Sequence, residues 1–523
     1  MRRWRRIGVL AAVLGLGVGE LAAAGVRRDS SPVFAVADAV VDLTPRVVKD
    51  LTIQLFGPAN KLVLLGGIAA ALLALAAWTG VLASRRLLNG TLLIALLGAV
   101  GVLAAVTRPG AGALDALPSI AAAIASAAGL TGLITASGLS ARAAAPQDGS
   151  VPQDGSAHRG DSGPPDGYDR RRLLVAGAVA GVGAVGAATL GRWLMSERFG
   201  ASRSRAVVRI PAPASTAQPS PKDLSRGVAD LSRFHTPNQE FYRVDTALAV
   251  PQLPAEEWRL RIHGMVERPL TIDYRQLLSR PLIERDITIA CVSNPVGGPY
   301  VGNARWVGAP LRELLREVSV AAGADQVVSR SHDGMTIGTP TAALVDGRDA
   351  MLAVAMNGEP LPIKHGFPVR MVVPGLYGYV SACKWIVDME LTTFAAYDAY
   401  WIKQGWAEQA EVKTASRIDA PRDGATVRAG AVVIGGVAWA QHRGVERVEV
   451  RIDDGPWQAA ELSREQSVDT WRQWVHRWTA TPGDHRLRVR ATDGLGERQT
   501  SARRDSFPDG ATGWHEVTVT VEG

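Results

Sequence analysis

Residues 286–298 read DITIACVSNPVGG and contain Cys291, one of the 2 cysteines in a chain of 523 residues. The isoleucines that alternate before this cysteine predict a short strand, and the proline and glycines after it predict a loop. A thiolate at such a strand-to-loop junction is often a metal ligand or a nucleophile. Cys291 is therefore the first candidate for a chemically active residue.

The second cysteine, Cys383, lies in the segment 364–386, which reads KHGFPVRMVVPGLYGYVSACKWI. This segment combines basic side chains with glycines and prolines. Backbone N–H groups and fixed cations in such a setting suit an anionic, phosphate-bearing ligand. Arg370 is the most informative of the cations, because it lies inside an apolar run and a buried arginine needs an anionic partner.

The two cysteines could also have purely structural roles. Cysteines in an exported domain can form a disulfide, and a buried cysteine can simply be a small apolar side chain. A disulfide between Cys291 and Cys383 would consume the thiolate, so the disulfide and a metal site exclude each other.

Together the two segments resemble the sulfite oxidase family of molybdenum-cofactor enzymes, and the resemblance extends from Asn238 to Gly523. In that family one cysteine is the only protein ligand to molybdenum, which implies that Cys291 ligates the metal and that Cys383 only packs. The family's HGxPxR…KW pattern holds the pterin phosphate, which implies a molybdenum–molybdopterin cofactor. The residues that the resemblance places at the cofactor are Asn238, Phe241, Tyr242, Asp333, His365, Arg370, Ser381 and Lys384. For His365 and Asp333, a role in a turn is the alternative.

The resemblance also implies residues at the reacting end of the cofactor. Tyr397 and Tyr400 both lie where the family has an active-site tyrosine, and the choice between them stays open. Arg243 falls near the family's substrate-binding arginine, although a surface position or a contact with the pterin phosphate explains it better. Two departures weaken any transfer of the substrate: RVD replaces the RNH of the animal enzymes, and Pro295 replaces an arginine.

Residues 224–405 predict an α+β cofactor domain rather than an alternating βαβ fold. We expect a strand at 258–262, helices at 309–318 and 348–355, and a buried strand at 369–373.

Residues 406–523 contain strand-like runs separated by turn signals, which predicts an all-β, immunoglobulin-like sandwich. This part resembles the dimerisation domain that follows the cofactor domain in sulfite oxidases, which implies that the chain can form a homodimer.

The N-terminal part has a different composition, rich in Ala, Leu, Gly and Val, with stretches long enough to span a bilayer, which takes about 20 residues. We predict a helical membrane region with four spans in 1–139, a flexible cytoplasmic loop at 140–172, a fifth span at 173–195 and a linker at 196–223. The five apolar stretches are 7–26, 62–83, 87–106, 113–135 and 173–195.

Two of these spans have alternatives. The first, preceded by MRRWRR, can also be a cleaved signal peptide. The fourth has Asp115 and Pro118 near its start and can also be an interfacial helix. The arginines before the fifth span, in DRRRLL at 169–174, resemble a twin-arginine export signal, and ordinary positive-inside charge explains them equally well.

The basic flanks favour a multi-pass protein of the cell membrane whose residues 200–523 lie on the extracytoplasmic side. Residues 1–157 contain neither His nor Cys, so this part offers no usual ligand for a haem or an iron–sulfur cluster. A separate electron-transfer partner is therefore expected. The net charge of +7 is spread over membrane flanks and scattered arginines, so we expect a lipid membrane and no nucleic acid as partner.

The sequence thus predicts a membrane-anchored, molybdopterin-dependent oxidoreductase that transfers an oxygen atom to or from a small oxyanion or oxide, with sulfite oxidation as the first expectation. Reduction of an S- or N-oxide, such as methionine sulfoxide, is the enzymatic alternative. A cell-surface interaction protein with a degenerate catalytic fold is the alternative of another class.

Overall fold

The computed structural model describes residues 1–26, 30–44, 60–108, 111–137, 170–246 and 250–523. The chain divides between Gly200 and Ala201 into two compact units. Most of the loop predicted at 140–172 lies outside the described residues.

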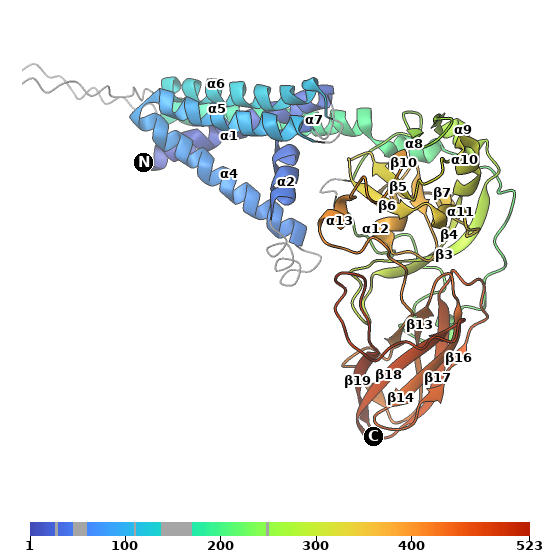
Figure 1. Ribbon diagram of the computed structural model, residues 1–523. Helices are drawn as coiled ribbons and strands as arrows, with labels where there is room; N and C mark the ends of the chain where they lie inside the picture. Colours follow the sequence, from blue (N-terminus) through green and yellow to red (C-terminus); the bar gives the residue numbers. More distant parts are fainter. Residues whose placement is uncertain (27–29, 45–59, 109–110, 138–169, 247–249) are drawn as a thin grey trace, which may run out of the picture. The chain divides into compact units, whose positions relative to one another are not determined.

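The first unit consists of helices (Figure 1). They are α1 (Arg2–Val26), α2 (Pro32–Leu43), α4 (Asn60–Arg85), α5 (Leu87–Val106), η3 (Ala113–Ala116), α6 (Leu117–Ala136) and α7 (Arg170–Phe199). Counting η3 and α6 as one segment, 5 helices are long and apolar enough to cross a membrane, which confirms the five apolar stretches expected from the sequence. The short helix α2 was not expected.

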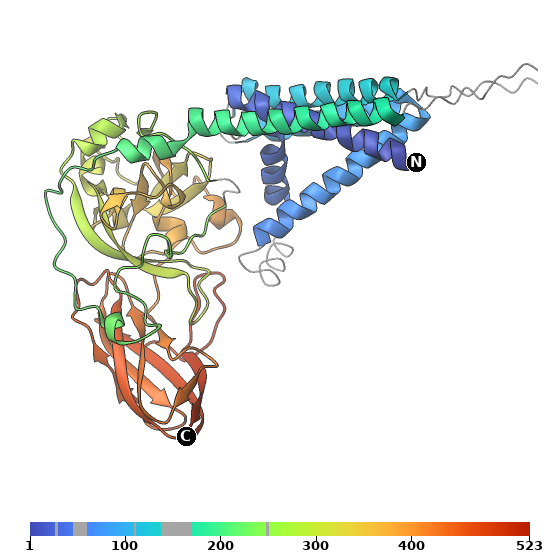
Figure 2. The same cartoon turned by 180° about the vertical axis from the view of Figure 1, so that it is seen from behind.

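Helix α1 packs against α4, α6 and α7, and Figure 2 shows α7 running beside the other helices of this unit. Glycines permit the close approach: a Cβ atom on Gly8 would lie 2.1 Å from the carbonyl oxygen of Ala76, and one on Gly17 would lie 2.5 Å from that of Ala184. Small residues at such crossings are typical of helices that associate in lipid. Asp115 accepts a hydrogen bond from the Gly112 N–H at 2.7 Å, so it closes the start of the fourth apolar segment rather than interrupting it.

The second unit begins with two sheets. The first has the order β3-β4-β7-β8, with β9 pairing to β7. Its strands are β3 (Ile283–Ala290), β4 (Val301–Pro310), β7 (Met351–Met356), β8 (Glu359–Pro360) and β9 (Arg370–Val372). The second has the order β2-β1-β10-β5-β6. Its strands are β1 (Arg259–Gly264), β2 (Leu270–Asp273), β5 (Gln326–Ser331), β6 (Thr336–Pro340) and β10 (Ile386–Thr392).

Short helices connect and cover these strands. They are α8 (Ala201–Val207), η4 (Leu224–Gly227), α9 (Tyr274–Leu278), α10 (Leu311–Val318), α11 (Ala342–Val345), η5 (Ile363–His365), α12 (Gly378–Ser381) and α13 (Tyr400–Lys403). The expected helix at 309–318 is α10, which buries its apolar face. Helix α8 lies inside the expected linker 196–223 and is docked, because the Arg205 guanidinium donates to the carbonyls of Pro360 and Leu361.

The helix expected at 348–355 is wrong: these residues enter β7, whose six residues are all buried. Strand β7 lies between β4 and β8. A strand buried on both faces presents a continuous apolar run, and such a run has no period that separates it from a buried helix.

The C-terminal part is a sandwich of two sheets, with strand orders β11-β13-β17-β16 and β12-β19-β18-β14-β15. Its strands are β11 (Ala415–Ala420), β12 (Thr426–Arg428), β13 (Gly430–Trp439), β14 (Val445–Ile452), β15 (Gln458–Ala459), β16 (Glu461–Leu462), β17 (Arg472–Ala480), β18 (Gly483–Asp493) and β19 (His515–Glu522). One core joins both sheets, with Ile434 and Trp474 from the first and Leu487 and Val519 from the second. The predicted fold class, helices followed by an α+β domain and an all-β sandwich, is confirmed.

Candidate functional site

Cys291 follows the last residue of β3, at the start of the turn that leads into β4. The two strands are antiparallel, and Ala290 faces Val301 at the open end of the pair. The Cys291 N–H donates to the Tyr300 carbonyl at 2.9 Å, which fixes the position of the cysteine backbone. The strand-to-loop junction expected around Cys291 is therefore present.

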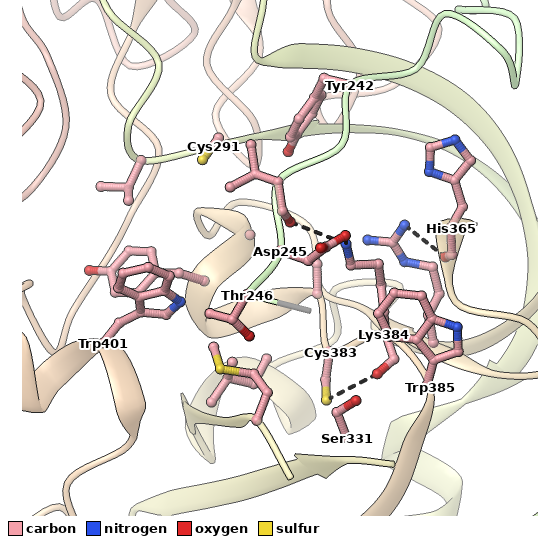
Figure 3. Close-up of a pocket in the computed structure, with 18 of the residues that line it drawn as sticks. Tyr242, Asp245, Thr246, Cys291, Ser331, His365, Cys383, Lys384, Trp385 and Trp401 are labelled. Atoms are coloured by element: carbon pink, nitrogen blue, oxygen red, sulfur yellow. Dashed lines mark hydrogen bonds and ion pairs between the residues drawn. The ribbon is translucent and has the colours of Figure 1, made fainter. Parts of the chain in front are cut away.

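A cavity lies beside this cysteine, and side chains from several separate segments surround it (Figure 3). The Cys291 thiol forms one wall. Seven of the residues predicted for the site line it, namely Phe241, Tyr242, Cys291, Asp333, His365, Arg370 and Lys384. The structure thus brings together residues that lie up to about 140 positions apart in the sequence.

Arg370 is the buried cation of this cavity, with an exposed fraction of 5%. Its guanidinium donates to the His365 carbonyl at 3.2 Å and lies over the Trp306 ring at 5.0 Å, while its Nε has no hydrogen-bond partner. Burial lowers the pKa of Arg370 to about 10. Among the described residues, no carboxylate forms an ion pair with Arg370, so its charge is uncompensated.

His365 contributes shape rather than charge. Its Nε2 lies 2.9 Å from the Asn238 carbonyl, which can only accept, so Nε2 carries the proton. Burial and the nearby Arg370 lower the pKa of His365 to about 3, so the imidazole is neutral near pH 7. Asn238 does not line the cavity; its side chain donates to the Met356 carbonyl and the Glu359 carboxylate.

Lys384 has a partner that the sequence did not suggest. Its ammonium lies 2.8 Å from the Asp245 carboxylate, which also accepts from the Arg243 guanidinium at 2.6 Å. Burial lowers the pKa of Lys384 to about 8, with Asp245 opposing that shift. Arg243 therefore faces Asp245 and is not among the residues that line the cavity.

The two cysteines are both free, so a disulfide between them is not formed. Burial raises the pKa of the Cys291 thiol, while a hydrogen bond with the Ser293 hydroxyl and the charge of Lys384 act in the opposite direction. Burial raises the pKa of Cys383 as well, and its Sγ points to the Lys384 carbonyl. Neither thiol is ionised near pH 7 unless a cation binds beside it.

Besides Asn238 and Arg243, three further predicted residues do not line this cavity. The Ser381 hydroxyl is buried and donates to carbonyls at residues 376 and 377, so it stabilises a turn. The Tyr397 hydroxyl lies 3.4 Å from the Thr336 hydroxyl. The Tyr400 ring packs on Trp401, and it is Trp401 that lines the cavity.

A second cavity, between the α+β domain and the sandwich, is also bordered by Cys291. Cys291, Asn294 and Tyr377 line it from the first and Lys413 and Arg443 from the second. Both of these cations are paired, Lys413 with Asp509 at 3.0 Å and Arg443 with Asp493 at 2.9 Å. Burial raises the pKa of Tyr377 to about 12, so this phenol keeps its proton. Cys291 is the one predicted site residue that borders both cavities.

Several site residues were missed from the sequence. Asp245, Tyr379 and Trp406 line the first cavity, and Tyr377 lines the second. Asp245 had a signal, because it is an acid in the RVD that departs from the family pattern. The tyrosines lay within the 364–386 segment but carried no signal of their own.

The first cavity suits an anionic cofactor with a thiophilic metal. A buried arginine with an orphaned Nε and no carboxylate needs an anion, and a phosphate supplies one. A cysteine thiolate is a ligand that soft metals prefer. Both features line one cavity, so the residues present fit a metal-bearing phosphate cofactor.

Comparison with known proteins also indicates a metal-bearing phosphate cofactor. Residues 247–401 match the family described as oxidoreductase molybdopterin binding domain. The chain is 30% identical over 324 residues to mitochondrial sulfite oxidase of Homo sapiens, covering 52% of this chain and 57% of that protein. It is 29% identical to the uncharacterized oxidoreductase YuiH of Bacillus subtilis, covering 34% of this chain and 88% of that protein.

A solved structure, the sulfane dehydrogenase SoxCD from Paracoccus pantotrophus, is 23% identical, with a TM-score of 0.48 over 55% of this chain and 84% of that chain. The chain spans little more than half the length of the curated sulfite oxidases it matches first.

Residues 247–401 are thus a molybdopterin-binding oxidoreductase domain, and the cofactor class is molybdenum held by molybdopterin. Beyond this domain, about half of the chain is similar to the sulfite oxidases.

Proposed function

We propose that the chain is a membrane-anchored molybdopterin-dependent oxidoreductase that transfers an oxygen atom to or from a small substrate. The observation that carries the proposal is the Cys291 thiol on the wall of a cavity whose buried Arg370 has no carboxylate partner among the described residues. A thiolate for the metal and a buried cation for the phosphate are the two groups that this cofactor needs from the protein.

Different residues of the chain would bind the two ends of the cofactor. When bound, molybdopterin supplies the two-electron redox chemistry. Cys291 holds the metal end, and Arg370 and Lys384 hold the phosphate end. His365 is neutral and packs edge-on against Phe241, so it supports the shape of the cavity without adding charge.

We assign the substrate to the second cavity, because Cys291 borders it while Arg370 and Lys384 line only the first. The Tyr377 phenol and the Asn294 amide line it, and both can donate a hydrogen bond to a substrate oxygen. Tyr377 is therefore a better candidate for the active-site tyrosine than Tyr397 or Tyr400, neither of which lines either cavity.

Sulfite oxidation is the first substrate assignment, in which water supplies the oxygen and two electrons leave to a separate partner protein. Reduction of an S- or N-oxide is the second. Of the three cations that line the substrate cavity, Lys413 and Arg443 have carboxylate partners, and Arg498 has no ion-pair partner among the described residues. Arg498 is therefore available to a substrate oxyanion, which supports sulfite as the first assignment. The oxide stays the second assignment because Arg243, the residue near the family's substrate-binding arginine, pairs with Asp245 and lines neither cavity.

The helices of the first unit would anchor the enzyme in the cell membrane, with residues 200–523 on the extracytoplasmic side. Helix α1 supports retention of the first span, because it packs against three other helices of that unit. The sandwich would support a homodimer.

The deciding experiment measures molybdenum and pterin in the purified full chain, produced in cells that make the cofactor. We expect about one metal per chain, and then either sulfite-dependent reduction of a dye or oxide-dependent oxidation of a reduced viologen. A folded protein that contains no molybdenum under these conditions contradicts the proposal.

A further inference from the structure

The sandwich contacts the strand that leads into Cys291. At Thr288, three residues before the cysteine, the N–H donates to the Asp469 carbonyl at 3.0 Å and the hydroxyl accepts from the Trp471 N–H at 2.8 Å. The Gln441 amide donates to the Thr288 carbonyl at 3.1 Å. Residues from the sandwich side of the boundary therefore bond the N–H, the carbonyl and the hydroxyl oxygen of Thr288, while the hydroxyl itself donates to the Asn303 side chain of β4.

The sandwich also contacts the loop that leaves Cys291. The Arg417 guanidinium, from β11, donates to the Gly298 carbonyl at 2.8 Å and to the Ser232 hydroxyl at 2.9 Å. Asp419 pairs with the same guanidinium at 2.6 Å and holds its orientation. Arg417 is largely buried, with 12% of its side chain exposed, so little solvent competes for these bonds.

His515, from β19, packs its ring against the same loop at Gly297. Gly297 has φ +76, and a Cβ atom there would lie 2.0 Å from the imidazole, so only glycine lets the ring sit this close. The Nδ1 of His515 accepts from the Ile418 N–H at 3.0 Å, which fixes the ring. Burial and the neighbouring Arg417 lower the pKa of His515 to about 4, in keeping with a neutral ring that accepts at Nδ1.

Two bonds to side chains lie within the loop: Asn294 accepts from the Tyr300 N–H at 2.8 Å, and the Cys291 Sγ lies 3.0 Å from the Ser293 hydroxyl. Besides these bonds and the backbone turns around them, the loop is held by its contacts with Arg417 and His515. We infer that Arg417 and His515 form a brace by which the sandwich positions the Cys291 loop, and that the sandwich is thereby part of the metal site. This inference rests on the proposed role of Cys291 as the metal ligand.

A matched control lies on the same boundary. Arg422 pairs with Asp230 and so also joins the sandwich to the cofactor domain, but 72% of its side chain is exposed. Exposed pairs of this kind contribute little to stability. Arg422→Gln removes a cation near Arg417 without touching the loop, so it separates a loss of charge from a loss of the brace.

The first test uses metal-free full chain, produced in cells that cannot make the cofactor. Iodoacetamide alkylation of Cys291 and Cys383 is followed separately by mass spectrometry. Arg417→Gln should speed alkylation of Cys291 by about tenfold, as expected when a charged hydrogen bond that closes the loop is lost. Cys383 should react at the wild-type rate, and Arg422→Gln should leave both rates unchanged.

The second test uses the loaded enzyme. Arg417→Gln should retain molybdenum but, after one-electron reduction of the metal to Mo(V), show shifted g values in its EPR spectrum, which a general loss of stability would not do. Arg417→Lys keeps the charge but cannot donate to both the Gly298 carbonyl and the Ser232 hydroxyl. Its Cys291 alkylation rate and its g values should therefore lie between those of the wild type and of Arg417→Gln. It replaces Arg417→Gln if that variant does not fold. Wild-type Cys291 alkylation and an unchanged EPR spectrum in a folded Arg417 variant overturn the brace. A chain that never binds molybdenum refutes the proposed function, yet the alkylation result still decides the brace.

Discussion

The Lys384 ammonium lies 2.8 Å from the Asp245 carboxylate inside the cofactor cavity. The pair leaves two neighbouring cations in different states: Lys384 is compensated by an acid of the chain, and Arg370 is not. A cofactor phosphate therefore gains most from Arg370 and must share Lys384 with Asp245. This difference leads to one prediction for each cation.

The first concerns pH. Lys384 has a pKa of about 8, lowered by burial, so it is charged below that pH and neutral above it. Its attraction for a phosphate is present at pH 7 and is lost as the pH rises through about 8. Cofactor retention, measured as molybdenum per chain after dialysis, should fall between pH 7 and about 9, a range in which Arg370 stays charged.

Lys384→Arg is the control, since an arginine remains charged over this range. Retention by this variant should not change between these two pH values. Identical pH profiles for the variant and the wild type would show that Lys384 does not hold the cofactor.

The second concerns Arg370. Arg370→Met removes a buried cation that has no carboxylate partner in the described part of the cofactor-free protein, so the melting temperature of that form should stay level or rise. The loaded protein should lose its anchor for the phosphate, and removing one partner of a buried ion pair typically costs about 3–5 kcal/mol. Molybdenum occupancy should therefore drop steeply. Full occupancy with only a raised KM would assign Arg370 to the substrate instead.

The sequence could predict the outline of the site because its chemistry is carried by two short segments. Cys291 and Arg370 were marked by residue type and setting, a thiol before a loop and a cation in an apolar run. The structure adds where these segments meet, a property of the pairing of β4 with β7 and of β7 with β9. No local pattern reports such long-range pairing.

The residues that were missed have a common cause. Asp245 can be recognised as a site residue only from its contact with Lys384, which is 139 positions away. Tyr377 can be recognised only once the cavity between the sandwich and the cofactor domain is known. Strand β7 was mistaken for a helix because burial on both faces removed the alternation that marks a strand. Local periodicity was reliable in those sandwich strands in which buried and exposed residues alternate, as in β19.

The third prediction tests the membrane topology. A periplasmic-type reporter fused after Gly523 should be active, because an odd number of spans places the C-terminus opposite a cytoplasmic N-terminus. Arg171→Lys combined with Arg172→Lys should block export if the arginines before the fifth span act as a twin-arginine signal. Activity only of a cytoplasmic reporter would reverse the assigned sides. Normal export of the double variant would leave these arginines as ordinary topology determinants.

The fourth prediction separates the two cysteines. Both are buried and both border the first cavity, but only Cys291 also borders the second cavity, where the substrate is assigned. Cys291→Ser should give a folded protein with little bound molybdenum, since a serine hydroxyl is a harder and less acidic ligand than a thiol. Cys383→Ser exchanges one small buried side chain for another and should retain the metal, with a modest loss of thermal stability. Molybdenum per chain and the melting temperature, measured for both variants, decide between these roles. Equal and large losses of stability in both variants, together with a Cys291–Cys383 disulfide seen by mass spectrometry, would mean that the cysteines serve the fold and not a metal.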